Sequence, residues 1–99
     1  MFYAVAVDDD SFAITHLSEH ATEAEALNAL IEFTKVEQAW RDDLAACCDE
    51  RGVPMVDQEE EYVTIKAILD KRANWTLDNL QDWTRGSDNQ NTMYIYEKK

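Results

Sequence analysis

Glycine and proline are scarce in this sequence, which has two glycines and one proline among 99 residues. Disordered and linker segments are usually rich in such residues and poor in apolar ones, whereas 45% of this chain is hydrophobic. No apolar run reaches the ~18 residues that a membrane helix requires. The first residues show neither the basic stretch nor the cleavable apolar region of a secretion signal. We therefore expect an ordered cytoplasmic protein without membrane contact.

Cysteine is limited to two neighbours, Cys47 and Cys48. Adjacent cysteines cannot join distant segments, so a disulfide framework is excluded. Reactive thiols need a nearby cation or a helix N-terminus, but these two precede Asp49 and Glu50 near the end of a helical pattern. We predict two reduced, partly buried and inert thiols.

The glycine-rich and nucleophile motifs of nucleotide-binding proteins and hydrolases are missing, as is C-x-x-C. We therefore expect no enzyme and no cofactor. One pattern stands against this: residues 16–20 read HLSEH, the H-x-x-E-H of inverted zinc proteases. That motif needs both histidines on one helical face and a third ligand from elsewhere. Here His16 ends an apparent strand and a helix start follows His20, so we interpret both as polar boundary residues. A small metal-binding protein or metalloenzyme is the alternative.

Basic residues are outnumbered, with 9 Lys and Arg against 21 Asp and Glu, a net charge of −12. Residues 1–61 hold 16 acids and 3 bases, whereas residues 62–99 hold 5 acids and 6 bases. Such a field repels DNA, RNA and anionic lipid and attracts basic protein surfaces. The composition therefore excludes direct nucleic-acid binding and favours a basic protein partner.

The N-terminal third predicts a β-hairpin followed by a helix. Residues 2–7 (FYAVAV) and 12–17 (FAITHL) have strand character, and residues 8–11 (DDDS) form a turn. Because the turn lacks glycine, we expect a loop of about three to five residues around a type I turn. Thr22 and Glu25 form a capping-box pattern that starts a helix.

The apolar residues that follow recur at steps of three and four as far as Gly52, with Pro54 beyond as a stop. This spacing predicts one helix of about 28 residues. Residues 58–73 also read as a helix, although Val63, Ile65, Ala67 and Leu69 alternate as a strand would.

Thr76 predicts the cap of a short helix through Trp83 that Gly86 closes, and residues 93–96 predict a last strand. The order β-β-α-α-α-β favours an α+β fold with a three-stranded antiparallel sheet and helices packed on one face. We expect a single compact α+β domain over residues 1–99.

Three groups of acids are the candidate partner-binding residues. At 100° per residue, four carboxylates fall within about 20° of one another along the long predicted helix, a row roughly 37 Å long. The acidic turn, which lacks the spacing of a calcium-binding loop, and a glutamate cluster extend this surface. The predicted residues are Asp8, Asp9, Asp10, Glu25, Glu32, Asp43, Glu50, Glu59, Glu60 and Glu61.

A compact acidic chain with no catalytic motif resembles the small inhibitors with which phages block host defence, the anti-CRISPR and DNA-mimic proteins. The resemblance covers length, the acid-rich first 61 residues and the α+β pattern, and no signature motif aligns. It implies a protein without chemistry of its own that docks on a basic nucleic-acid-binding surface of a host complex and occludes it.

Two other interpretations of the surface remain open. The acids form a solvated face that keeps the protein soluble, or the chain is a homo-oligomeric accessory subunit with exposed aromatics such as Tyr94, Tyr96 or Trp75 at its interface.

Overall fold

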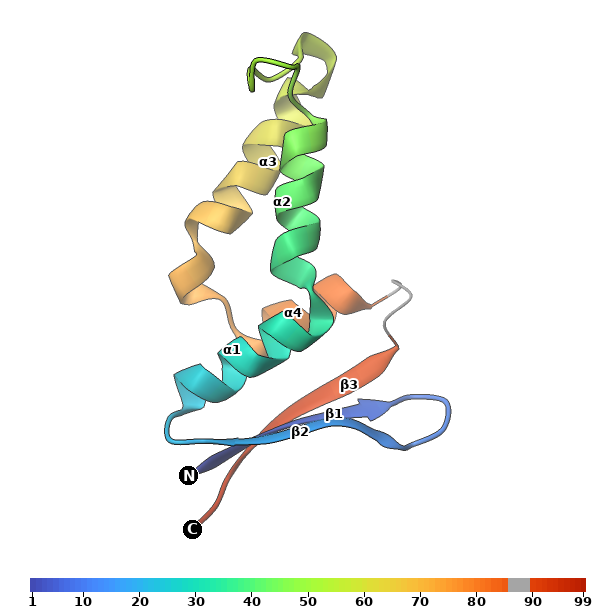
Figure 1. Ribbon diagram of the computed structural model, residues 1–99, viewed down its shortest axis with the longest axis vertical. Coiled ribbons are helices and arrows are strands. Elements are labelled where there is room, and N and C mark those ends of the chain that lie inside the picture. The colour runs from blue at the N-terminus through green and yellow to red at the C-terminus, as the bar shows by residue number, and fades with distance from the viewer. Residues whose placement is uncertain (86–89) are drawn as a thin grey trace. The chain divides into compact units, whose positions relative to one another are not determined.

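The computed structural model describes residues 1–85 and 90–99, which include one three-stranded antiparallel sheet (Figure 1). Its strands, in the order β2-β1-β3, are β1 (Phe2–Asp8), β2 (Ile14–His20) and β3 (Asn91–Glu97). The described residues also form four α-helices, α1 (Glu23–Thr34), α2 (Val36–Ala46), α3 (Glu59–Asp70) and α4 (Leu77–Thr84), and 3-10 turns at Val56–Gln58 and Arg72–Asn74. The predicted α+β class with a three-stranded antiparallel sheet is confirmed, and residues 59–70 are helix, not strand.

Contacts divide the chain into two compact units, a subdivision that the sequence pattern did not indicate. The sheet unit comprises Met1–Val36 and Thr76–Lys99, and it holds the sheet, α1 and α4. The hairpin unit comprises Glu37–Trp75, and it holds nearly all of α2 and the whole of α3.

The core of the sheet unit lies between one face of the sheet and the helices α1 and α4. Ala4 and Ala6 on the central strand are fully buried, and so is Met93, which pairs with Ala6 on β3. The small side chains of Ala4 and Ala6 let the helices approach the central strand closely. The helices contribute buried residues in return, Ala26, Leu30 and Ile31 from α1 and Leu80 from α4. The ring of His16 on β2 lies 5.1 Å from that of Phe33 on α1, which fixes the helix-covered face.

The turn between β1 and β2 has five residues, 9–13, within the predicted length. Asp8 holds it: its Oδ1 accepts hydrogen bonds from the backbone N–H of Asp10 (2.8 Å) and Ser11 (3.1 Å). The second strand was predicted to begin at residue 12 but begins at Ile14, because Phe12 lies in the turn with φ of +59°. A left-handed residue closes the turn where glycine is the usual choice.

The single long helix predicted up to Gly52 is wrong. Lys35 adopts φ of +60°, ends α1, and donates its backbone N–H to Ile31 O and Glu32 O. The Thr34 hydroxyl donates to Ile31 O (3.0 Å) and accepts from the backbone N–H of Val36 (3.4 Å), where α2 begins. The apolar period continues across this break because both helices bury one side. The sequence pattern therefore did not reveal it.

The second helix also ends earlier than predicted, at Ala46. Gly52, with φ of +78°, lies in the turn between Cys48 and Pro54, which pair in an isolated β-bridge. Asp49 closes that turn, because its Oδ1 accepts from the backbone N–H of Arg51 (2.9 Å) and Val53 (3.1 Å). Gly52 therefore serves a local turn and not a helix end.

The predicted helix starts at Thr22 and Thr76 are confirmed, whereas the helix predicted over residues 58–73 spans 59–70. Thr22 Oγ1 accepts from the N–H of Glu25 (3.2 Å), and Thr76 Oγ1 accepts from the N–H of Asn79 (3.1 Å), while the backbone N–H of Thr76 donates to Asn79 Oδ1 (3.3 Å). Gly86, the predicted end of the last helix, lies outside the described residues, and the last strand is longer than predicted, 91–97 instead of 93–96. Within the described ranges, no helix has the length and apolar character needed to cross a membrane.

Candidate functional site: the acidic tip of the helical hairpin

The HLSEH motif lies entirely within strand β2, which runs to His20. Side chains alternate along a strand, so Glu19 faces away from His16 and His20. The helical face that the zinc motif needs is therefore not formed. Among the residues that the structure describes, no group of three or more metal-ligating side chains gathers.

The same alternation places three polar side chains in a row on the helix-covered side of β2, and the sequence pattern did not predict this row. Ser18 Oγ lies 2.8 Å from His16 Nε2 and 2.7 Å from His20 Nε2. The hydroxyl can donate to one ring and accept from the other. The row satisfies three half-buried polar groups at once. A strand extended to His20 would have been the signal for it.

The predicted straight row of helical carboxylates does not exist. Glu25 and Glu32 lie on α1 in the sheet unit, whereas Asp43 lies on α2 and Glu50 lies in the turn beyond it, both in the hairpin unit. The left-handed residue Lys35 ends the shared helix axis on which the row depended. All four carboxylates are exposed, so each remains a candidate for binding on its own unit.

The structure instead gathers acids at one end of the hairpin unit, where residues 47–58 join α2 to α3 (Figure 1). We define the hairpin tip as residues 47–61. It carries six acids, Asp49, Glu50, Asp57, Glu59, Glu60 and Glu61, and one base, Arg51. The rest of the hairpin unit, residues 37–46 and 62–75, carries four acids and four bases. The whole net charge of this unit, −5, therefore lies at its tip.

Apolar side chains stand exposed among these acids. The exposed fractions are 91% for Val56, 48% for Val53 and 37% for Met55. A shallow depression on α3 has both Val56 and Val63 in its wall beside Glu59 and Glu60. Exposed apolar side chains rimmed by charge are typical of protein interaction sites, since a solvated face meant only for solubility does not need them.

The thiol of Cys47 lies near acids of both helices. Burial raises the pKa of Cys47, and the carboxylates of Glu61 and Asp43 raise it further. Glu61 belongs to α3 and Asp43 to α2, so the hairpin brings acids from both helices toward one thiol. Cys47 and Cys48 are both free thiols, as predicted, and the negative surroundings oppose thiolate formation at Cys47.

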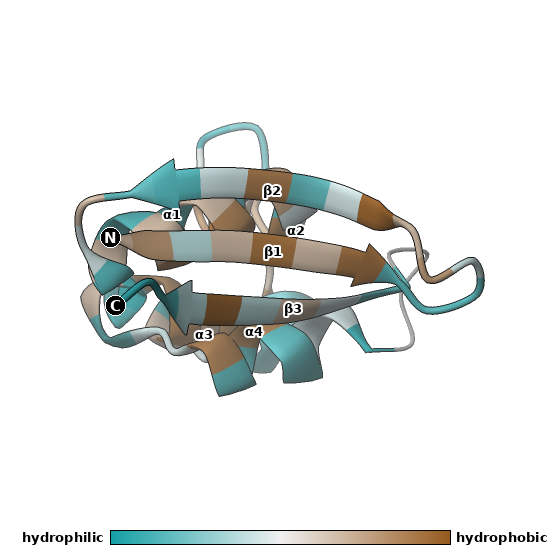
Figure 2. Cartoon of the chain, turned by 90° about the horizontal axis from the view of Figure 1, so that it is seen from below, coloured by the Kyte–Doolittle hydropathy of each residue, from teal (hydrophilic) through white to brown (hydrophobic). Residues whose placement is uncertain are grey.

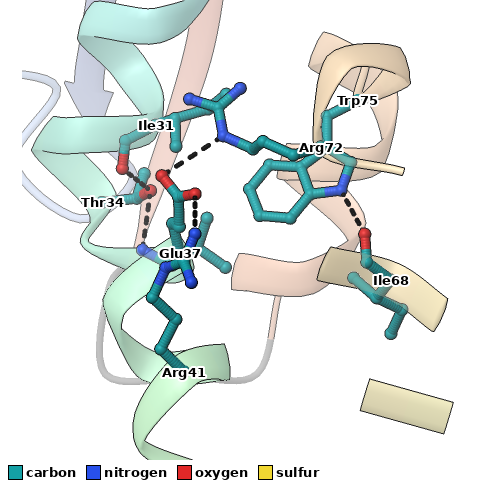
Figure 3. Close-up of polar contacts among 8 residues, drawn as sticks. Ile31, Thr34, Glu37, Arg41, Ile68, Arg72 and Trp75 are labelled. Carbon is teal, nitrogen blue, oxygen red and sulfur yellow. Dashed lines mark hydrogen bonds and ion pairs between the residues drawn. The ribbon is translucent and has the colours of Figure 1, made fainter. Parts of the chain in front are cut away.

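Away from the tip, the charges of the hairpin unit neutralise one another (Figure 3). Glu37 pairs with Arg41 and Arg72, each at 3.2 Å. The Arg72 guanidinium also lies 5.0 Å from the ring centroid of Trp75, whose indole N–H donates to Ile68 O at 2.9 Å. Lys66 pairs with Asp70 at 3.1 Å. None of the ten predicted partner-binding acids takes part in an ion pair within the described ranges.

The acidic turn of the sheet unit has a partly structural role. The backbone N–H groups of Ser11 and Asp10 lower the pKa of Asp8. Asp9 Oδ1 accepts from the Thr92 hydroxyl at 2.5 Å. Asp9 and Asp10 are exposed while Asp8 is half-buried, so Asp10 is the acid of this turn most available to a partner.

The aromatic residues proposed for an oligomer interface differ in their exposure to solvent. Trp75 is only 6% exposed, so its proposed place at an interface is wrong. Tyr94 and Tyr96 are 40% and 54% exposed, and their rings stack with centroids 5.7 Å apart on β3.

Fold alone does not determine function, so we also compared the chain with known proteins. A scan against protein-family models found no match, and neither did searches of curated proteins and of solved structures.

Proposed function

We propose that this chain is a cytoplasmic binding protein without catalysis, which inhibits a nucleic-acid-handling complex by occupying its basic surface. The observation that carries the proposal is the hairpin tip, where a net charge of −5 surrounds exposed Val53, Met55 and Val56. This arrangement suits a cationic groove with apolar contacts at its base. The resemblance to small phage-encoded inhibitors points to the same class of partner.

Physical chemistry supports both halves of such an interface. Carboxylates that no lysine or arginine neutralises attract a cationic partner over about a Debye length, ~8 Å at physiological salt, and raise its association rate. Once docked, the exposed valines bury apolar area, which contributes roughly 25 cal/mol per Å². The carboxylates of α1 and the acidic turn add to the net negative charge that attracts such a partner.

The first experiment captures partners from a prokaryotic lysate on the immobilised chain and elutes them with rising salt. A nucleic-acid-binding complex is expected to elute at moderate salt, and a double-stranded DNA oligonucleotide should displace it. If nothing salt-sensitive is captured, the acidic surface is a solubility feature and the proposal fails.

A matched pair of variants then tests the hairpin tip. Glu59→Lys with Glu60→Lys, and Glu25→Lys with Glu32→Lys, each change the net charge from −12 to −8. We expect the tip variant to weaken binding by at least about 100-fold and the α1 variant by about tenfold or less, because Glu25 and Glu32 do not belong to the hairpin tip and contribute through the net charge. Circular dichroism checks that each variant keeps the helix content of the unaltered chain. Equal losses would place the contact elsewhere.

A further inference from the structure

The second face of the sheet lies free of α1 and α4, which pack on the opposite face (Figure 2). The strand register places nine side chains on this open face in three cross-strand rows. In the order β2, β1, β3, these rows are Glu19, Tyr3 and Tyr96; Leu17, Val5 and Tyr94; and Ile14, Val7 and Thr92. Leu17 and Ile14 are 60% and 62% exposed.

This open face is almost free of charge on a strongly acidic chain. The sheet unit carries eleven acids and four bases, a net charge of −7, yet Glu19 is the single charged residue among the nine. A basic partner has little to pair with here. A flat, uncharged surface fits another flat, uncharged surface.

The open face is also laterally self-complementary. Its β2 side presents the aliphatic residues Ile14 and Leu17, and its β3 side presents the stacked rings of Tyr94 and Tyr96. A two-fold axis running along β1 places the β2 side of one copy over the β3 side of another. Leu17 then meets Tyr94 of the second copy, and Glu19 meets the hydroxyl of Tyr96. The two Glu19 carboxylates lie at opposite edges, where they do not repel each other.

We propose that the open sheet face is a homodimer interface, in which two copies pack face to face about a two-fold axis parallel to β1. Twisted sheets pack in this way with strands aligned at about −30° and ~10 Å apart. Three seven-residue strands cover roughly 24 Å by 14 Å, or about 340 Å² per copy in projection. The two copies together cover about 680 Å², less than the ~1,200 Å² of stable interfaces, so we expect a weak dimer with a dissociation constant of about 10 µM or more.

The homodimer proposal does not rest on the proposed function, and the two differ in how binding depends on salt concentration. Two copies of charge −12 repel each other, so screening strengthens the dimer, whereas screening weakens attraction to a basic partner. Sedimentation velocity from about 10 µM to about 1 mM, at low and at high salt, measures the dimer directly. A monomer throughout this range overturns the proposal and leaves the proposed function untouched.

Two substitutions test the geometry. Leu17→Glu is expected to raise the dissociation constant at least about tenfold, whereas Val56→Glu, an equal charge change at an exposed residue of the hairpin unit, should leave it within about twofold. Mixing the Leu17→Glu chain with a Tyr94→Lys chain should restore dimers, because the new charges face each other across the two-fold axis. A dimer that Leu17→Glu leaves unchanged, as edge-to-edge pairing of β2 or β3 would, overturns the proposal.

A measurement on the unaltered chain covers the outcome in which Leu17→Glu fails to fold. Amide NMR spectra recorded across the same dilution should show shifts concentrated in β1, β2 and β3 and not in residues 47–61. Shifts concentrated at the hairpin tip would contradict the interface.

Discussion

At the scale of single residues, Lys35 determines where the first helix ends. Its left-handed conformation separates α1 from α2 and so assigns Glu25 and Glu32 to one unit and Asp43 and Glu50 to the other. A residue with a Cβ is strained there, since the left-handed region costs roughly 1–2 kcal/mol outside glycine. The strain is retained because the surrounding hydrogen bonds to Ile31 and Glu32 fix the turn.

Lys35→Gly is therefore expected to stabilise the folded chain by about 0.5–1 kcal/mol, after the greater freedom of glycine in the unfolded chain is counted. Urea denaturation measures the free energy of unfolding. Lys35→Ala is the matched control, because it removes the same exposed side chain but keeps the strain. A gain in the alanine variant as large as in the glycine variant would contradict this explanation.

At the scale of elements, the ion pair between Glu37 and Arg72 joins the first turn of α2 to the 3-10 turn that follows α3. Burial alone would raise the pKa of Glu37, but the hydrogen bonds and charges of Arg72 and Arg41 outweigh burial, so the pKa lies below its ordinary value. A carboxylate with a lowered pKa stabilises the folded state above its unfolded pKa. That contribution is lost as the pH falls through the folded pKa.

Glu37→Gln should accordingly lower the free energy of unfolding by about 0.5–1 kcal/mol at neutral pH. The difference from the unaltered chain should shrink as the pH drops below the folded pKa of Glu37, because the native carboxyl is then also neutral. Urea denaturation across this pH range provides the test. Asp70→Asn, which breaks the more exposed pair with Lys66, should have a smaller effect. A pH-independent loss in Glu37→Gln would show that packing, not charge, is responsible.

Elements were predictable where a local signal exists. Thr22 and Thr76 mark helix starts because a cap is a contact between near neighbours in the chain. The break at Lys35 has no such signal, since a lysine seldom ends a helix in this way and the apolar period runs through it. The open sheet face was hidden for a related reason: FYAVAV is apolar on both sides, and the sequence does not say which side the helices cover.

At the scale of the whole molecule, the site was partly predictable. The sequence alone identified the candidate acids, and four of them belong to the hairpin tip: Glu50, Glu59, Glu60 and Glu61. Their grouping needed the end of α2, which the sequence pattern had placed at Gly52 and the structure places at Ala46. Val56 is exposed in the 3-10 turn Val56–Gln58, which the sequence pattern did not predict.

The sheet order β2-β1-β3 also sets the order in which the molecule can assemble. Strand β1 precedes the hairpin unit in the chain and β3 follows it, although the two strands pair, as Phe2 does with Glu97. The hairpin unit, in contrast, is one continuous segment. Local contacts form faster than distant ones. In pulsed hydrogen exchange during refolding, amides of α2 and α3 should gain protection before those that join β1 to β3. Simultaneous protection would contradict this order.

Until β3 arrives, one edge of β1 remains unpaired and open to the β3 of another chain, the exchange that produces strand-swapped assemblies. The net charge of −12 opposes the meeting of two such intermediates. The acidity of this chain should therefore oppose strand swapping during folding, and the yield of swapped species that do not dissociate on dilution should rise as salt is raised.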